Sequence, residues 1–208
     1  MLFQLFQKNS SLHSELYIRA EAPSVDNIET AKHIIIEEYK KYPEIIKKSK
    51  LEIVNLVSHL RVKNNKDIDK FVAVSESPDP EVHMMYVDVD YVSNEEYFRQ
   101  CVNHEIWHLY DFGVSGSFTP KDELWESLNP PNFVYGPGGW VSYHTDFNNN
   151  FHPSIGFITS YSMLGIDEDK AEIFMYYFTE HLRSKLDEVI EQDLNIKGKL
   201  DLILKKCD

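Results

Sequence analysis

The sequence is poor in the residues that mark disulfide-stabilised and membrane-spanning proteins. Only two of its 208 residues are cysteines, Cys101 and Cys207, which is too few for a disulfide framework and compatible with a reducing compartment. No apolar run approaches the roughly 18 residues that a spanning helix needs. Gln and Lys interrupt the first segment, MLFQLFQKNSSLHSE, too early for a Sec signal. We therefore expect a cytoplasmic protein, or one exported by a route without a recognisable signal.

Basic residues are also scarce. Lys and Arg number 21 against 34 Asp and Glu, which gives a net charge of −13 and argues against nucleic acid or an anionic membrane as the main partner. The imbalance is local: residues 40–70 carry nine basic and four acidic residues, whereas residues 76–172 carry three and seventeen. The acidic half is either a solvated surface, or a region that holds a cation or attracts a basic substrate.

The hydrophobic pattern predicts an α+β fold in one domain, residues 24–208, with residues 1–23 unassigned. Apolar spacings of three and four predict helices, and short segments rich in β-branched residues predict strands. The predicted helices are 24–41 (with a short turn to 48), 94–111, 167–186 and 187–205, and the predicted strands are 51–62, 71–75 and 82–92. Turns are predicted at 64–67 and 77–80, and an irregular stretch at 112–160. Candidate helix caps are Ser24 or Asp26, Ser93 or Asn94, and Asp167.

The predicted helix 94–111 contains the pattern H-E-x-x-H, from His104 through Glu105 to His108. Residues four apart lie on one helix face, about 5–6 Å apart at Cβ. Two imidazoles so placed can bind one Zn²⁺, with the glutamate beside the open coordination position. The neighbouring residues are largely apolar, so the helix is expected to be buried, where unpartnered polar groups are costly. The alternative is an ordinary amphipathic helix with hydrogen-bonded histidines.

A catalytic zinc site needs a third protein ligand. The metzincin extension of the pattern fails, because Asp111 and Val114 occupy its Gly and His positions. His144 and His152 lie in the predicted irregular stretch, where a lone histidine is more typical of a surface residue.

The better candidates for the third ligand are Glu168 and Glu172, on the next predicted helix. They are four residues apart and therefore share a face. One can bind the metal while the other hydrogen-bonds a ligand imidazole. The spacing alone leaves open which does which.

In these two predicted helices the sequence resembles the gluzincin-type zinc metallopeptidases related to anthrax lethal factor and the bacterial Pro-Pro endopeptidases. HEIWHLYD (104–111) matches H-E-x-x-H followed by an Asp three residues on. ITSYSMLGIDEDKAEIF (158–174) matches T-S-Y, a Glu seven residues after the Tyr, and F-A-E-x-F, with Lys170 in place of an apolar residue. WESLNPPNFVYG (125–136) resembles a block in uncharacterised bacterial zinc peptidases. Together the blocks cover about 40 residues.

The resemblance implies a zincin-like metallopeptidase domain with an N-terminal helix, a small sheet, the H-E-x-x-H helix and a C-terminal helix that bears the glutamate. It also implies a role for each matched residue. The implied zinc ligands are His104, His108 and Glu168, the general base is Glu105, the phenol that stabilises the oxyanion is Tyr161, and the outer partners of the ligands are Glu172 and Asp111.

The sequence therefore predicts a zinc-dependent peptidase with one Zn²⁺ per chain and a protein or peptide substrate; it carries no signal for oligomeric state. Three alternatives stay open. The fold could keep its metal and bind a partner without cleaving it, it could hydrolyse a non-peptide amide, or it could be a metal-free interaction protein. The aromatic-rich loop 125–151 could line a cleft or simply cover the helices, and the strand near 84–91 could pair with an extended peptide or lie within the sheet.

Overall fold

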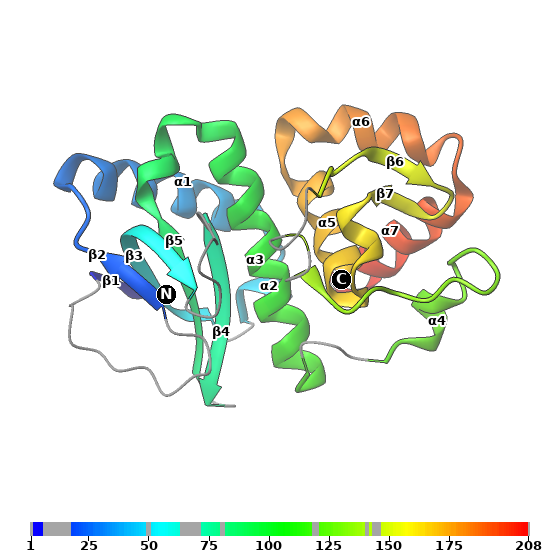
Figure 1. Cartoon of the computed structure of the whole chain (residues 1–208), viewed down its shortest axis with the longest axis horizontal. Coiled ribbons are helices and arrows are strands. Elements are labelled where there is room, and N and C mark those ends of the chain that lie inside the picture. The colour runs from blue at the N-terminus through cyan, green and yellow to red at the C-terminus, as the bar shows by residue number, and fades with distance from the viewer. Residues whose placement is uncertain are drawn as a thin grey trace.

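A long helix, α3 (Glu95–Ser115), runs between a small β-sheet and a group of C-terminal helices (Figure 1). The computed structural model describes residues 2–5, 18–48, 51–62, 72–79, 82–117, 121–139, 142 and 147–207. Besides α3, the helices are α1 (Val25–Lys41), α2 (Glu44–Lys48), α4 (Glu123–Glu126), α5 (Ile166–Phe178), α6 (Glu180–Ile190) and α7 (Leu194–Cys207), with 3₁₀ turns η1 (Val89–Ser93) and η3 (Tyr161–Met163). Within these ranges no helix is both long and apolar enough to cross a membrane.

The sheet is built around β3. Its strands are β1 (Leu2–Leu5), β2 (Ile18–Glu21), β3 (Leu51–Val62), β4 (Ala73–Asp79) and β5 (Val82–Asp88). Strand β3 pairs in parallel with β1 and β5 and antiparallel with β2, while β4 pairs antiparallel with β5 and forms an edge of the sheet as described. Residues 1–23, unassigned from the sequence, thus contribute two strands. A hairpin of β6 (Phe151–Ser154) and β7 (Phe157–Thr159) lies beside α5 (Figure 1).

Alternation along the central strands divides the sheet into two faces. Val54 and Leu56 of β3, with Met85 and Val87 of β5, join the main hydrophobic core that also contains residues of α1, α3, α5 and α7. Their neighbours in sequence, such as Tyr86, pack in a smaller cluster. Helix α3 therefore packs against the sheet and α1 on one side and against α5 on the other. This packing fixes the position of its polar residues.

The predicted α+β class is confirmed, and several elements have the predicted bounds. Helix α1 begins after Ser24, whose hydroxyl accepts the Asn27 N–H at 3.4 Å, and β3 covers the predicted 51–62. Asn94 caps α3 by accepting the N–H of Tyr97. The predicted turn at 64–67 lies outside the described residues. The predicted 77–80 turn is wrong in part, because β4 continues through Pro78 to Asp79.

The predicted irregular stretch 112–160 is wrong at both ends. Helix α3 continues to Ser115 and ends at Gly116, whose left-handed φ of 71° allows its N–H to donate to the Phe112 carbonyl at 2.7 Å. Helix α4 and the β6–β7 hairpin also fall within this stretch. Short strands and a one-turn helix have too few residues to show a clear period.

The two predicted C-terminal helices are in fact three. The chain is extended at Thr179 (φ −86°, ψ 112°), which separates α5 from α6, and α7 starts after Asp193. The apolar pattern continues through Thr179, so the periodicity does not show the break. The predicted cap Asp167 is also wrong: it lies inside the first turn of α5, and Gly165 occupies the cap position.

Candidate metal centre

Helix α3 presents its two histidines toward α5 because apolar side chains on its other faces are buried in the core. Phe98, Val102 and Trp107 have no exposed surface. Asn103, also buried, donates to Glu38 Oε2 at 3.0 Å and to Thr179 Oγ1 at 2.9 Å. These contacts fix the rotation of the helix about its axis and leave the face of His104 and His108 opposite α5.

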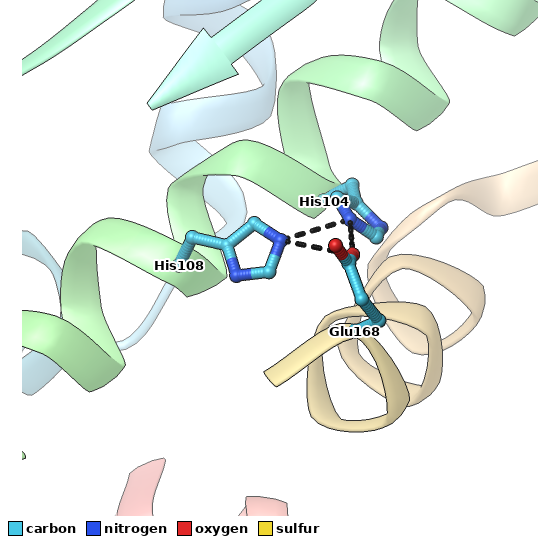
Figure 2. Close-up of side chains that lie close together, drawn as sticks. All are labelled: His104, His108 and Glu168. Atoms are coloured by element: carbon cyan, nitrogen blue, oxygen red, sulfur yellow. Dashed lines mark hydrogen bonds and ion pairs between the residues drawn. The ribbon is translucent and has the colours of Figure 1, made fainter. Parts of the chain in front are cut away.

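Three side chains from α3 and α5 point toward one another (Figure 2). His104 Nε2 lies 3.0 Å from His108 Nε2 and 3.0 Å from Glu168 Oε2, and His108 Nε2 lies 3.3 Å from the same oxygen. Only about a tenth of each side chain is exposed. The donor atoms of one tetrahedral Zn²⁺ lie about 3.3–3.6 Å apart. The group is therefore able to hold a metal ion with small adjustments.

The hydrogen bonds around His104 also favour a metal. Its Nδ1 lies 3.1 Å from Glu172 Oε1, an acceptor, so this nitrogen carries a proton, and in the neutral form of the ring Nε2 presents a lone pair. That lone pair faces the His108 nitrogen and the Glu168 oxygen. One proton on His108 Nε2 cannot form hydrogen bonds to His104 Nε2 and Glu168 Oε2 with good geometry at the same time. A metal ion, in contrast, accepts a lone pair from each of these three atoms.

The pKa values of His104 and Glu168 are both shifted by their close neighbours. Burial by itself lowers the pKa of His104, but hydrogen bonds and charge interactions with Glu168 and Glu172 outweigh it and hold that pKa well above its ordinary value. Burial raises the pKa of Glu168, yet the two histidines together bring it far below its usual range. Without a metal, the cluster thus favours a positively charged imidazole beside a carboxylate.

The structure separates the two glutamates that the sequence left equivalent. Glu168 Oε2 faces the Nε2 atoms of both histidines, whereas Glu172 contacts the opposite nitrogen of His104. The second oxygen of Glu172 accepts the hydroxyl of Thr159 at 2.7 Å. Glu168 therefore belongs to the group that is able to hold a metal ion, and Glu172 holds the opposite nitrogen of the His104 ring.

A pocket of about 360 Å³ lies beside the metal group, which consists of His104, His108 and Glu168. Glu105 and Tyr161 both line it, together with His104 and Glu172. The ring centre of Tyr161 lies 5.7 Å from that of His104, and the Tyr161 N–H donates to Asn149 Oδ1 at 2.9 Å. The structure thus brings the predicted base and the predicted phenol to one cavity with the metal group.

The comparisons with known proteins bear on the fold. No protein-family model matches the chain, and no curated protein matches it. Among solved structures, the chain is similar to a candidate zinc-binding metallo-peptidase from Bacteroides caccae ATCC 43185, with a TM-score of 0.59 over 98% of this chain and 77% of that one. The fold is metallopeptidase-like. At 16% identity the likeness extends to the fold and not to individual residues.

Asp111, predicted as an outer partner of the ligands, is a buried member of a charge network with Lys170, Lys206 and Asp122. Its carboxylate is 3.3 Å from Lys170 Nζ and 3.1 Å from Lys206 Nζ. Lys170 is 1% exposed and also pairs with Asp122 at 3.1 Å. Lys170 stands where the resembling enzymes have an apolar residue, and the two aspartates compensate its charge. The network joins α3 to α5 and α7, and a role for Asp111 at a ligand stays a prediction.

Of the histidines in the 112–160 stretch, His152 is not part of the metal group. His152 Nε2 pairs with Asp193 Oδ2 at 3.0 Å, near the start of α7. His144 lies outside the described residues. The resembling block 125–136 contacts α5: Trp125 of α4 and Tyr135 of the loop after it both donate to the buried Asp169.

Sequence reasoning missed Gly139, which closely approaches the metal group. A Cβ at this position would lie 2.0 Å from Glu168 Oε1 and 2.3 Å from the Tyr161 hydroxyl. The loop is held there because the N–H groups of Gly136 and Gly138 donate to the carbonyls of Met163 and Leu164. The G-P-G-G run at 136–139 was a visible signal, but nothing in it indicates which side chains the last glycine meets.

We expect Gly139→Ala to weaken metal binding by about tenfold or more, because relieving such overlap costs about 1–3 kcal/mol and the displaced groups are Glu168 and Tyr161. Zinc affinity measured by competition with a chromophoric chelator checks this. Gly113→Ala is the matched control, since its Cβ would meet only the ring of His83, with Cε1 at an ordinary 3.4 Å and Nδ1 at 3.9 Å. Equal zinc affinity in the two variants would show that the approach of Gly139 does not restrict the metal group.

Proposed function

We propose that the protein is a zinc-dependent metallopeptidase of the gluzincin type, with His104, His108 and Glu168 as metal ligands. One observation carries the proposal: Nε2 of both histidines and Oε2 of Glu168 meet within 3.3 Å, next to a pocket lined by Glu105 and Tyr161. Two imidazoles and one carboxylate form a donor set that suits Zn²⁺. Zinc bound there would supply Lewis acidity, which polarises a peptide carbonyl and acidifies water.

The protein's own residues supply the proton transfers and the charge stabilisation. The Glu105 carboxylate is the general base that accepts a proton from water and then delivers it to the leaving amine. The phenol of Tyr161 donates a hydrogen bond where negative charge develops on the carbonyl oxygen. Glu172 holds His104 with its proton on Nδ1, so that Nε2 keeps its lone pair.

The edge of the sheet suits an extended peptide. Val72 and the first residue of β4, Ala73, line the same pocket as Glu105 and Tyr161. Ser75 of β4 donates to the main-chain carbonyl of Glu105 at 2.8 Å, which fixes the strand against α3. Strand β5, which the sequence left as a possible peptide-pairing strand, is internal, between β3 and β4. We therefore place a peptide substrate along β4, where main-chain pairing and the pocket act together.

The metal content of the purified protein tests this proposal. We expect about one zinc per chain in the wild type, and loss of the metal in the double variant His104→Ala/His108→Ala, because two of three protein ligands are removed. Elemental analysis after zinc loading and desalting provides the measurement. His33→Ala, at an exposed histidine of α1, should keep the metal. Failure of the wild type to bind zinc would overturn the proposal.

The effect of pH on the same preparation adds a second check. The raised pKa of His104 means that protons compete with the metal. In the zinc-free protein, the stability from this group is complete below the unfolded pKa of about 6.5 and is lost as pH rises through the folded pKa. Zinc requires the deprotonated ring, so its stabilising effect grows over the same rise. The Tm difference between zinc-loaded and chelator-treated protein should thus be larger at high than at low pH.

A further inference from the structure

Thr159, the last residue of β7, uses every hydrogen-bonding position of its hydroxyl group. The hydroxyl donates to Glu172 Oε2 at 2.7 Å and accepts the N–H of Ser162 at 3.1 Å. The Ser162 hydroxyl lies 3.2 Å away. Because a hydroxyl has a single proton, and that of Thr159 goes to a carboxylate that can only accept, the Ser162 hydroxyl is the donor of this bond. Thr159 is 3% exposed and Ser162 is fully buried, so water does not replace these contacts.

The Glu172 carboxylate is thus held between two partners. Oε1 accepts from His104 Nδ1 at 3.1 Å, and Oε2 accepts from Thr159. Glu172 is 4% exposed. Without the Thr159 hydroxyl, Oε2 would be left unsatisfied in a buried place, at a cost that favours rotation of the carboxylate away from His104. The hydrogen bond from Thr159 therefore restrains both the carboxylate and the proton on Nδ1.

The same hydroxyl also fixes the turn that bears the phenol. Ser162 lies within η3, directly after Tyr161, and its N–H is bound by Thr159. One side chain therefore connects the carboxylate that orients His104 with the turn that places Tyr161. We propose that Thr159 is a positioning residue for the metal centre, acting through Glu172 on His104 and through Ser162 on Tyr161. This inference rests on the proposed function and deepens it.

The test compares Thr159→Val, which keeps the shape and removes the hydroxyl, with Thr159→Ser, which keeps the hydroxyl. Ser58→Ala is the matched control: Ser58 of β3 is 7% exposed and its hydroxyl also donates to a carboxylate, that of Asp90. We expect zinc affinity to fall about 10–100-fold in Thr159→Val and to be largely restored in Thr159→Ser. Ser58→Ala should lose stability and keep zinc affinity. Chelator competition and the visible spectrum of the Co²⁺-substituted protein report the site without relying on activity.

A readout in the zinc-free protein separates this inference from the proposed function. The Nδ1–H proton of His104 should give a low-field NMR resonance that is protected from exchange in the wild type and in Thr159→Ser, and weakened in Thr159→Val. Wild-type zinc affinity together with an unchanged resonance in Thr159→Val would overturn the inference and leave the peptidase proposal intact. Absence of zinc binding in the wild type would overturn the peptidase proposal, and the resonance would then decide alone whether Thr159 positions His104.

Discussion

Replacing Glu105 by glutamine is expected to remove nearly all peptide hydrolysis while leaving the metal bound. Glu105 follows His104 on α3 and lines the pocket with Tyr161, but it is not one of the three converging donors. Glutamine has nearly the same shape and cannot accept the proton. The loss of a general base typically lowers the rate about 10²–10⁴-fold. The decrease should fall on kcat, with KM little changed, because the substitution leaves the main-chain contacts that we propose along β4 unaltered.

The experiment uses fluorogenic peptide pools with wild type, Glu105→Gln and the control Glu96→Gln, an exposed glutamate in the first turn of the same helix. Zinc content is measured on each sample. If wild type binds zinc and retains peptides without cleaving them, the interpretation as a metal-containing binding module replaces the peptidase. If Glu105→Gln keeps more than about a tenth of the activity, Glu105 is not the base.

Helical spacing in the sequence predicted which side chains of the metal group share a helix face, but not how the two helices meet. His104 and His108 share a helix face by spacing, and the structure brings them together with Glu168. Spacing left Glu168 and Glu172 equivalent because both point from α5 toward α3. Which carboxylate meets Nε2 and which meets Nδ1 depends on the crossing of the two helices and on the side-chain rotamers. The resemblance to gluzincins favoured Glu168, and Glu168 is the carboxylate that meets Nε2 of both histidines.

The parts that the sequence did not predict come from contacts between segments without a helical period. Gly139 reaches the metal group through main-chain hydrogen bonds of its loop to η3, and Thr159 reaches Glu172 from the end of a three-residue strand. The break at Thr179 is similar in kind. Asn103 of α3 donates to its hydroxyl, and this tertiary contact accompanies an extended backbone inside an apolar pattern that reads as continuous helix.

The largest effect on stability is expected from Lys199→Met. Lys199 of α7 and Asp169 of α5 have no exposed surface, and their charged atoms are 2.6 Å apart. Asp169 Oδ2 also accepts from Trp125 and Tyr135, and Lys199 donates to the Gly156 carbonyl. Removing one partner of a buried ion pair leaves an uncompensated charge, which costs about 3–5 kcal/mol. Since Asp169 adjoins Glu168 on α5, zinc affinity should fall as well.

The double variant Asp169→Asn/Lys199→Met distinguishes the charge from the packing, and should recover a large part of the loss because no buried charge remains. Lys197→Met, at an exposed lysine of the same helix, is the control. Free energies of unfolding from urea titration provide the measurement.

Burial raises the pKa of Asp169, an effect that Lys199 opposes in the wild type. In Lys199→Met the protonated carboxyl is favoured in the folded state, so the deficit should be smaller at low pH and grow as pH rises through the folded pKa. A deficit in Lys199→Met that is independent of pH and unchanged in the double variant would show that lost packing, rather than an unpaired Asp169, causes the instability.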